Sequence, residues 1–187
     1  MIAFKEGDCV YFASPMKYQN FFTQARVDYT FEENGDIWHL NDGKGTIVMA
    51  AAKSSRLVDI LRYSDVFACE FSYEGMKSII ENIKNCVKGT NCFTEGDRLG
   101  VTLVVAQGDR AFEITTHGSV FEMDRFLCCD ESDERMLAVY EYCKNIPDAH
   151  ERIRTIYTNI NEIGLSQMFP VAVINTRDDT YTLLTQS

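Results

Sequence analysis

The chain has 187 residues, of which 45% are apolar and 25% are charged, and its formal net charge is −10. This composition is typical of a globular protein, and the length predicts a single domain over residues 1–187 with a substantial buried core. The acidic balance argues against nucleic-acid binding, which needs a basic face for phosphates, and against binding to anionic membrane surfaces.

The sequence shows no pattern typical of a targeting segment or of a metal site. No stretch approaches the roughly 20 apolar residues of a membrane-spanning helix, and residues 1–6 lack the apolar core of a secretory signal. The seven cysteines form no CxxC pair and no Cys/His cluster with zinc-ligand spacing. We therefore expect reduced thiols in a cytoplasmic protein that binds no metal and no cofactor.

The first half of the chain is expected to form strands followed by two helices. The dipeptide Asn34-Gly35 is typical of a two-residue hairpin turn, and residues 17–22 are expected to be an aromatic-rich loop. Strands are predicted at five segments: 1–5, 9–13, 23–31, 36–40 and 46–50. A cap at Ser54 or Ser55 predicts a helix at 54–63, and apolar residues spaced by three or four predict a second helix at 72–87.

The segment 100–125 lies at the centre of the predicted fold. Its apolar run 101–106 is rich in β-branched residues and too short for a helix, and a Gly-Asp turn leads from it to a second strand at 111–115. A third strand is expected to begin at residue 119. Three successive strands predict an antiparallel meander, and the continuous apolar run indicates that the first strand is covered on both faces.

The second half of the chain is expected to add two helices and a hairpin. The acidic run 130–134 opens a helix that ends before Pro147, and acidic residues suit a helix N-terminus. Asp148 caps a second helix, and strands at 170–174 and 181–184 form the hairpin. Strands that alternate with pairs of helices predict an α+β fold. The expected architecture is a four-layer αββα sandwich of two antiparallel sheets, each flanked by a helix pair.

Four segments carry motifs beyond their secondary structure. The segment 7–14 is a turn followed by an apolar strand, and 36–50 is a hairpin with a small, apolar return strand. The segment 100–122 is the central meander, and 171–176 is a C-terminal strand. In their order these motifs resemble the proteasome β-subunit and HslV branch of the N-terminal nucleophile (Ntn) hydrolases, over nearly the whole chain. The resemblance implies the αββα Ntn-hydrolase fold.

The resemblance also implies a chemistry, which the sequence does not fully support. In the family an N-terminal Thr, Ser or Cys attacks a carbonyl while its own α-amine serves as base, and a lysine assists the amine in losing its proton. Here the chain starts with Met1 and Ile2, and the lysine position falls on or next to Asp36. Ser166 matches a family serine, and Cys129 replaces another. These departures together predict a lost or altered activity.

The sequence offers four candidate catalytic residues: Thr46, Cys9, Ser166 and Cys129. Thr46 follows Gly45, a pattern typical of a processing junction, and a cut there would make Thr46 an N-terminal nucleophile. The alternative is a strand residue, because the cut would discard two hairpins. Cys9 could act as an N-terminal nucleophile after cleavage of the Asp8-Cys9 bond, although Cys9 lies inside a predicted strand. Cys128-Cys129 at a helix N-terminus favours a thiolate pair, or else two packing residues.

We therefore expect a catalytically degenerate homologue of proteasome-type Ntn hydrolases. Because family members assemble in rings, the resemblance implies a subunit of a homo-oligomer, and a binding module with an unidentified ligand is a further possibility. The alternative is an active threonine- or cysteine-type peptidase or amide hydrolase formed by self-processing. An unrelated α+β binding protein would be indicated by a topology without two stacked sheets.

Overall fold

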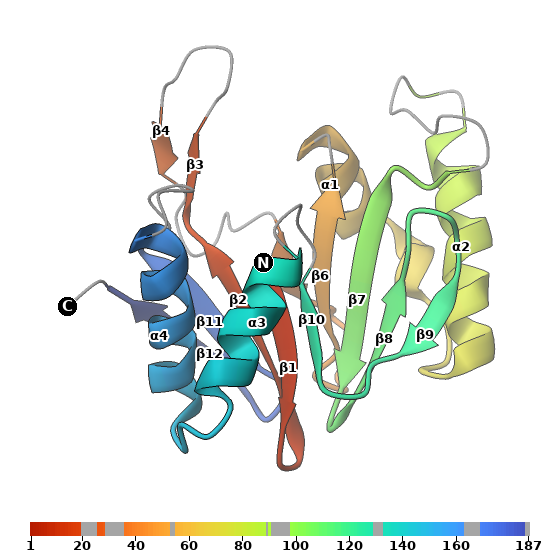
Figure 1. Cartoon of the computed structure of the whole chain (residues 1–187). Helices are drawn as coiled ribbons and strands as arrows, with labels where there is room; N and C mark the ends of the chain where they lie inside the picture. The colour runs from red at the N-terminus through yellow and green to blue at the C-terminus, as the bar shows by residue number, and fades with distance from the viewer. Residues whose placement is uncertain are drawn as a thin grey trace.

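The computed structural model describes residues 1–19, 26–28, 36–52, 55–88, 90, 98–128, 133–162 and 169–185. These residues form two five-stranded antiparallel sheets and a two-stranded ribbon. Figure 1 shows the two sheets packed together with helices outside each of them.

The first sheet is built from both ends of the chain and has the order β10-β1-β2-β11-β12. Its strands are β1 (Ile2–Glu6), β2 (Cys9–Pro15), β10 (Phe126–Cys128), β11 (Val171–Asn175) and β12 (Asp178–Leu184). Ile2 pairs with Ala13 on β2 and with Cys128 on β10, so β1 lies inside the sheet. The hairpins expected at the two ends of the chain are confirmed.

The second sheet comes from one continuous stretch of chain and has the order β5-β6-β7-β8-β9. Its strands are β5 (Ile37–His39), β6 (Ile47–Ala52), β7 (Val101–Gln107), β8 (Arg110–Ile114) and β9 (Val120–Glu122). The predicted central meander is confirmed as β7-β8-β9. Both faces of β7 are covered as expected, because Val105 packs against the outer helices and Val104 packs between the sheets.

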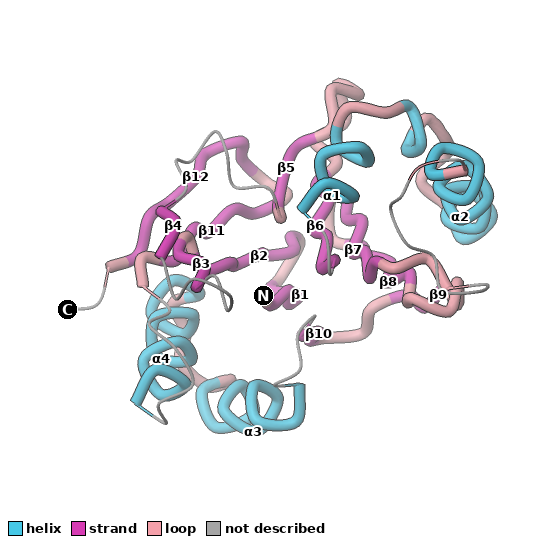
Figure 2. Tube along the Cα trace, turned by 90° about the horizontal axis from the view of Figure 1, so that it is seen from above, coloured by secondary structure: helices cyan, strands magenta, loops and turns pink. Residues whose placement is uncertain are grey.

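The helices form the two outer layers, as Figure 2 shows from above. The helical segments beside the second sheet are α1 (Ser55–Arg62), η2 (Asp65–Phe67) and α2 (Tyr73–Val87), and those beside the first are α3 (Asp133–Cys143) and α4 (Ala149–Glu162). The cap expected at Asp148 is confirmed, because its Oδ1 accepts from Glu151 N at 2.7 Å. Ser72 caps α2 in the same way, with its Oγ accepting from Gly75 N at 3.1 Å. Among the described helices, none is long and apolar enough to cross a membrane.

Three apolar clusters separate the four layers. One joins α1 and α2 to the second sheet, a second lies between the sheets, and a third joins the first sheet to α3 and α4. Met49, Met76 and Tyr157 are fully buried examples, one from each cluster. The predicted αββα sandwich is confirmed.

Some local predictions need correction. Lys17–Gln19 was expected to be loop, but it forms strand β3 and pairs with β4 (Arg26–Asp28). β4 lies inside the strand predicted at 23–31, whereas the rest of that strand and the Asn34-Gly35 turn lie outside the described residues. The strand β10 was not predicted, because its three residues show no alternation and pair with a strand more than 100 residues earlier.

Candidate functional site

Polar groups from four parts of the chain meet where β1 begins. Met1 precedes β1, Asp36 precedes β5, Arg62 ends α1 and Tyr181 lies on β12. The positive charges of the Met1 amino group and of Arg62 act on the Asp36 carboxyl, and Arg62 also acts on Tyr181. We call these four residues the Asp36 cluster.

Backbone pairing and ring contacts hold the Asp36 cluster in place. The Asp36 carbonyl accepts a hydrogen bond from Ala50 N at 2.7 Å. The Tyr181 hydroxyl donates to the Ile37 carbonyl at 3.3 Å and so links β12 of the first sheet to β5 of the second. The Arg62 guanidinium lies over the Trp38 ring, 5.5 Å from its centroid. The cluster therefore lies where one edge of each sheet meets the other.

The electrostatics of the cluster are dominated by burial. Burial raises the pKa of Asp36 to about 6, although the Met1 amino group and Arg62 act in the opposite direction. Burial also raises the pKa of the Tyr181 hydroxyl, again opposed by Arg62. A carboxyl group with a pKa near 6 changes its protonation state close to neutral pH, so it can hold or release a proton at this position.

The raised pKa of Asp36 predicts a pH-dependent stability. Between pH 4 and 6 the folded state binds more protons at Asp36 than the unfolded state, so wild-type stability falls as pH rises through this window. Asp36→Asn removes the cost of the buried charge. We expect it to stabilise the protein by roughly 3 kcal/mol at pH 7.5 and to have little effect at pH 4. Urea unfolding at several pH values measures the difference.

Asp59→Asn is the matched control for this prediction. Asp59 lies on the exposed side of α1, so the substitution removes the same charge from a solvated position. A stability difference between Asp36→Asn and wild type that stays constant from pH 4 to 7.5 would contradict the assignment of Asp36 as a buried acid.

Thr46 does not belong to the Asp36 cluster. It precedes β6 at the opposite end of the β5-β6 pair, so the length of β5, roughly 13 Å, separates it from Asp36. Thr46 is buried, and its hydroxyl donates to Asp42 Oδ2 at 2.5 Å, while Lys44 N donates to Asp42 Oδ1 at 2.8 Å. The hydroxyl is thus part of the turn that closes the hairpin.

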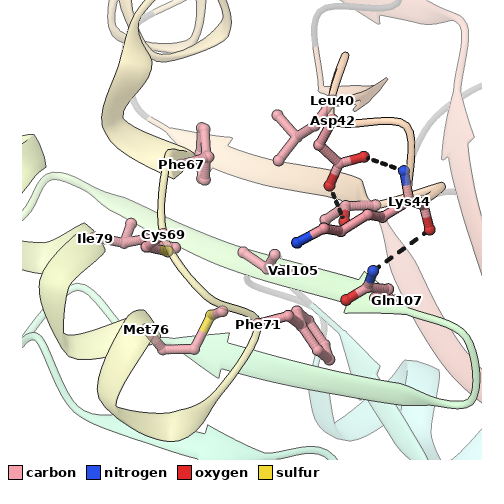
Figure 3. Close-up of a pocket in the computed structure, with 11 residues that line it drawn as sticks. Leu40, Asp42, Lys44, Phe67, Cys69, Phe71, Met76, Ile79, Val105 and Gln107 are labelled. Atoms are coloured by element: carbon pink, nitrogen blue, oxygen red, sulfur yellow. Dashed lines mark hydrogen bonds between the residues drawn. The ribbon is translucent and has the colours of Figure 1, made fainter.

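A small pocket lies beside Thr46 (Figure 3). Asp42, Lys44 and Gln107 form its polar side, and residues of η2 and α2, such as Phe67 and Met76, form its apolar side. Gln107 Nε2 donates to the Lys44 carbonyl at 3.5 Å. Because this pocket opens at the Thr46 end of β6, it is separate from the Asp36 cluster.

Cys9 also lies far from the Asp36 cluster. It pairs with Glu6 at the far end of the β1-β2 hairpin, and its thiol donates to the Glu6 carbonyl at 3.4 Å. Burial raises the pKa of Cys9. The side-chain hydrogen bond with Tyr11 opposes this shift, and the charges of Glu6 and Asp178 add to it. The neutral thiol is therefore favoured over the nucleophilic thiolate.

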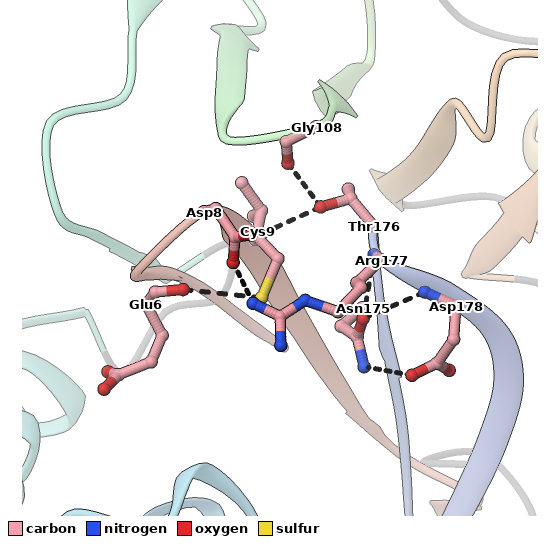
Figure 4. A network of polar contacts seen from close by, with 9 residues as sticks. Glu6, Asp8, Cys9, Gly108, Asn175, Thr176, Arg177 and Asp178 are labelled. Atoms are coloured by element: carbon pink, nitrogen blue, oxygen red, sulfur yellow. Dashed lines mark hydrogen bonds and ion pairs between the residues drawn. The ribbon is translucent and has the colours of Figure 1, made fainter.

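A polar network closes the end of the sandwich that holds Cys9 (Figure 4). Thr176 Oγ1 accepts from Val10 N at 2.9 Å and donates to the Gly108 carbonyl, so one hydroxyl bonds to both sheets. Arg177 pairs with the Asp8 carboxylate in the adjacent turn. These contacts connect three turns and give this end of the molecule a structural role.

Of the candidate catalytic residues, the two that the structure describes do not belong to the Asp36 cluster. Thr46 and Cys9 lie away from it, and Cys129 and Ser166 lie outside the described residues. Cys128, which precedes Cys129, packs against the apolar cluster of α3 and α4. Arg62 and Tyr181 were not anticipated, because no local sequence pattern relates either of them to Asp36.

Comparisons with known proteins support the fold. The chain matches no protein-family model and no curated protein. The protein BPH of Thiobacillus denitrificans matches in two solved structures. The BPH structure in complex with epoxomicin has a TM-score of 0.73 and 15% sequence identity to this chain. The match covers 93% of this chain and 96% of the BPH chain. The other BPH structure has a TM-score of 0.72 and 13% sequence identity, and the match covers 93% of this chain and 95% of the BPH chain.

The eukaryotic HslV of Trypanosoma brucei also matches. Its TM-score is 0.66 at 14% identity, and the match covers 93% of this chain and 97% of that one. These likenesses show that the chain has an Ntn-hydrolase-like fold of the HslV and proteasome type.

Proposed function

We propose that this chain is a catalytically silent protein of the proteasome-type Ntn fold that works as a subunit of a homo-oligomer. The observation that carries the proposal is the buried carboxyl group of Asp36, which lies at or next to the position where the family has its lysine. A neighbouring carboxylate favours the charged form of an amine, whereas a neighbouring lysine favours the neutral form. Since an α-amine serves as a base only when neutral, Asp36 opposes the chemistry that the fold is known for.

The composition of β1 supports the same conclusion. Its residues, Ile2–Glu6, carry no hydroxyl or thiol group, and Ile2, Ala3 and Phe4 are completely buried. The start of β1 therefore contributes apolar packing between the layers and no nucleophile beside Asp36.

The alternative function is an amide hydrolase that forms by cleavage before Thr46. One observation favours it: the Thr46 hydroxyl already bonds to the Asp42 carboxylate at 2.5 Å, and a carboxylate can accept the proton of an attacking hydroxyl. Against it, the cut would separate β1, β2 and β5 from the rest of the chain, and β1 and β2 lie inside the first sheet. The silent fold is therefore the stronger proposal.

The proposal is tested by intact mass and by exposure to epoxomicin, which is bound in one of the BPH structures. We expect the mass of the purified protein to stay at 21.3 kDa, with no adduct after incubation with the compound. BPH treated in the same way is the positive control. An adduct, or a shorter species that begins at Thr46 or Cys9, would favour the hydrolase.

A further inference from the structure

The pocket beside Thr46 combines one cation with an apolar wall (Figure 3). Its polar side is the turn between β5 and β6, where Lys44 is the cation. The apolar wall comes from η2, α2, β7 and the segment that joins η2 to α2: Phe67, Cys69, Phe71, Met76, Ile79 and Val105. We call this feature the Lys44 pocket. It shares no residue with the Asp36 cluster, so the proposed function does not account for it.

The ammonium group of Lys44 is not engaged by the protein. Figure 3 shows the Lys44 side chain extending into the pocket, and it forms no ion pair with any residue that the structure describes. Asp42 lines the same pocket, but its carboxylate is held in the turn by Lys44 N at 2.8 Å and by Thr46 Oγ1 at 2.5 Å. Other lysines each pair with a glutamate three residues earlier: Lys77, Lys84 and Lys144. The Lys44 charge therefore remains available to a ligand.

The Cys69 thiol on the apolar wall lies within the field of this cation. Burial raises the pKa of Cys69, and the positive charge of Lys44 acts in the opposite direction. Cys69 is half-buried and forms no disulfide. A small reagent can therefore reach the thiol, whose reactivity reports on what occupies the pocket.

The size of the pocket limits the ligand. The enclosed part has a volume of about 20 Å³, which is room for roughly one group the size of a methyl. The rest of the pocket opens to solvent beside Lys44. The apolar wall thus suits the end of a short alkyl chain, and the single cation suits a single negative charge.

We propose that the Lys44 pocket binds a short-chain aliphatic monocarboxylate, with the carboxylate on the Lys44 ammonium and the end of the alkyl chain against the apolar wall. An inorganic phosphate or sulfate fits less well, because it needs several donors and would lose its hydration against apolar side chains. The positive end of the α2 dipole adds to the attraction, since Met76 lies in the first turn of that helix. The net charge of −10 repels anions elsewhere, so binding depends on Lys44.

Alkylation of Cys69 by iodoacetamide, measured by peptide mass spectrometry at neutral pH, tests the proposal with butyrate as the ligand. A dissociation constant of roughly 10–50 mM, as expected for so small a ligand, means that about 100 mM sodium butyrate slows alkylation about threefold or more. The comparison is with sodium chloride at the same concentration, which matches the ionic strength. Cys86 on α2 does not line the pocket and is the reference in the same sample.

Two further compounds separate charge from apolar contact. Butyramide has the shape of butyrate without its charge, and we expect it to leave the alkylation rate of Cys69 unchanged. Acetate keeps the charge but has a shorter alkyl chain, so it should protect Cys69 less than butyrate does. Equal protection by butyrate and butyramide would overturn the role of Lys44, and equal protection by acetate and butyrate would overturn the role of the apolar wall.

Lys44→Met is expected to abolish the protection by butyrate. The rates with and without butyrate are compared within each variant, because the substitution itself changes the reactivity of Cys69. Lys88→Met is the matched control, since Lys88 is an exposed lysine at the other end of α2. Loss of protection in Lys44→Met alone supports the proposal. Protection that survives Lys44→Met, or its absence in the wild type, overturns it and leaves the proposed function, which is tested by mass, unaffected.

Discussion

Replacing Arg152 with methionine is expected to lower the free energy of unfolding by about 2–4 kcal/mol. Arg152 is only 3% exposed. Its Nη1 donates to Glu6 Oε2 at 2.5 Å, and its Nε and Nη2 donate to the Ile146 carbonyl at 3.1 and 2.5 Å. The guanidinium also lies over the Phe4 ring, 5.4 Å from its centroid. One buried cation thus joins α4 to β1 and to the loop between α3 and α4.

The expected loss comes mainly from the Ile146 carbonyl. Methionine fills a similar volume but cannot donate, so this acceptor loses both of its hydrogen bonds from Arg152. The Glu6 side chain is 38% exposed and can be hydrated, which keeps the loss below that of a fully buried ion pair. Urea unfolding at neutral pH measures the effect.

Arg154→Met is the control for this substitution. Arg154 lies two residues along α4, is 33% exposed, and pairs with Glu151 on the same helix at 2.5 Å. Such a pair contributes at most about 0.5 kcal/mol. If both variants lose the same small amount of stability, the buried cation is not a structural link.

Replacing Gly75 with alanine is expected to destabilise the protein by about 3 kcal/mol, although the same change usually stabilises a helix. A Cβ atom at Gly75 would lie 1.8 Å from the carbonyl oxygen of Glu70 and 2.9 Å from its carbon. Both are backbone atoms of the segment that leads into α2, so the helix or that segment must move. The movement would also disturb the cap, in which Gly75 N donates to Ser72 Oγ.

Gly7→Ala separates this steric effect from the loss of a glycine. Gly7 has a φ of +59°, and no atom lies within 4 Å of the position that a methyl group would occupy, so only its left-handed backbone opposes the substitution. We expect a cost of about 1 kcal/mol there. Thermal unfolding of both variants should show the larger loss for Gly75→Ala, and equal losses would mean that α2 shifts freely at its first turn.

The strands and helices were predictable where local pattern and packing agree. The run 101–106 is apolar on both faces because β7 is covered by helices on one side and by the other sheet on the opposite side. Asp148 caps its helix as its side chain predicts. By contrast, β10 was missed because its pairing with β1 is set by the fold and not by its own three residues.

The candidate site was less predictable for the same reason. Asp36 could be singled out by its place in a hairpin that resembles the one led by the family lysine. The action of the Arg62 charge on Asp36 depends on the packing of α1, and the hydrogen bond from Tyr181 to the neighbouring Ile37 depends on the meeting of β5 with β12. No local pattern specifies either. Thr46 was singled out by its Gly45 neighbour, whereas in the structure its hydroxyl completes a turn.

The origin of the two sheets has a consequence for how the protein folds. The second sheet consists of residues 37–122 alone, so its strands pair with neighbours that are close in sequence. The first sheet joins β1 and β2 to β11 and β12 from the other end of the chain, and contacts between distant segments form slowly. During synthesis the β1-β2 hairpin is made first but stays incomplete until the last strands emerge. We expect its apolar residues to be the segment most exposed to aggregation and to chaperones before folding ends.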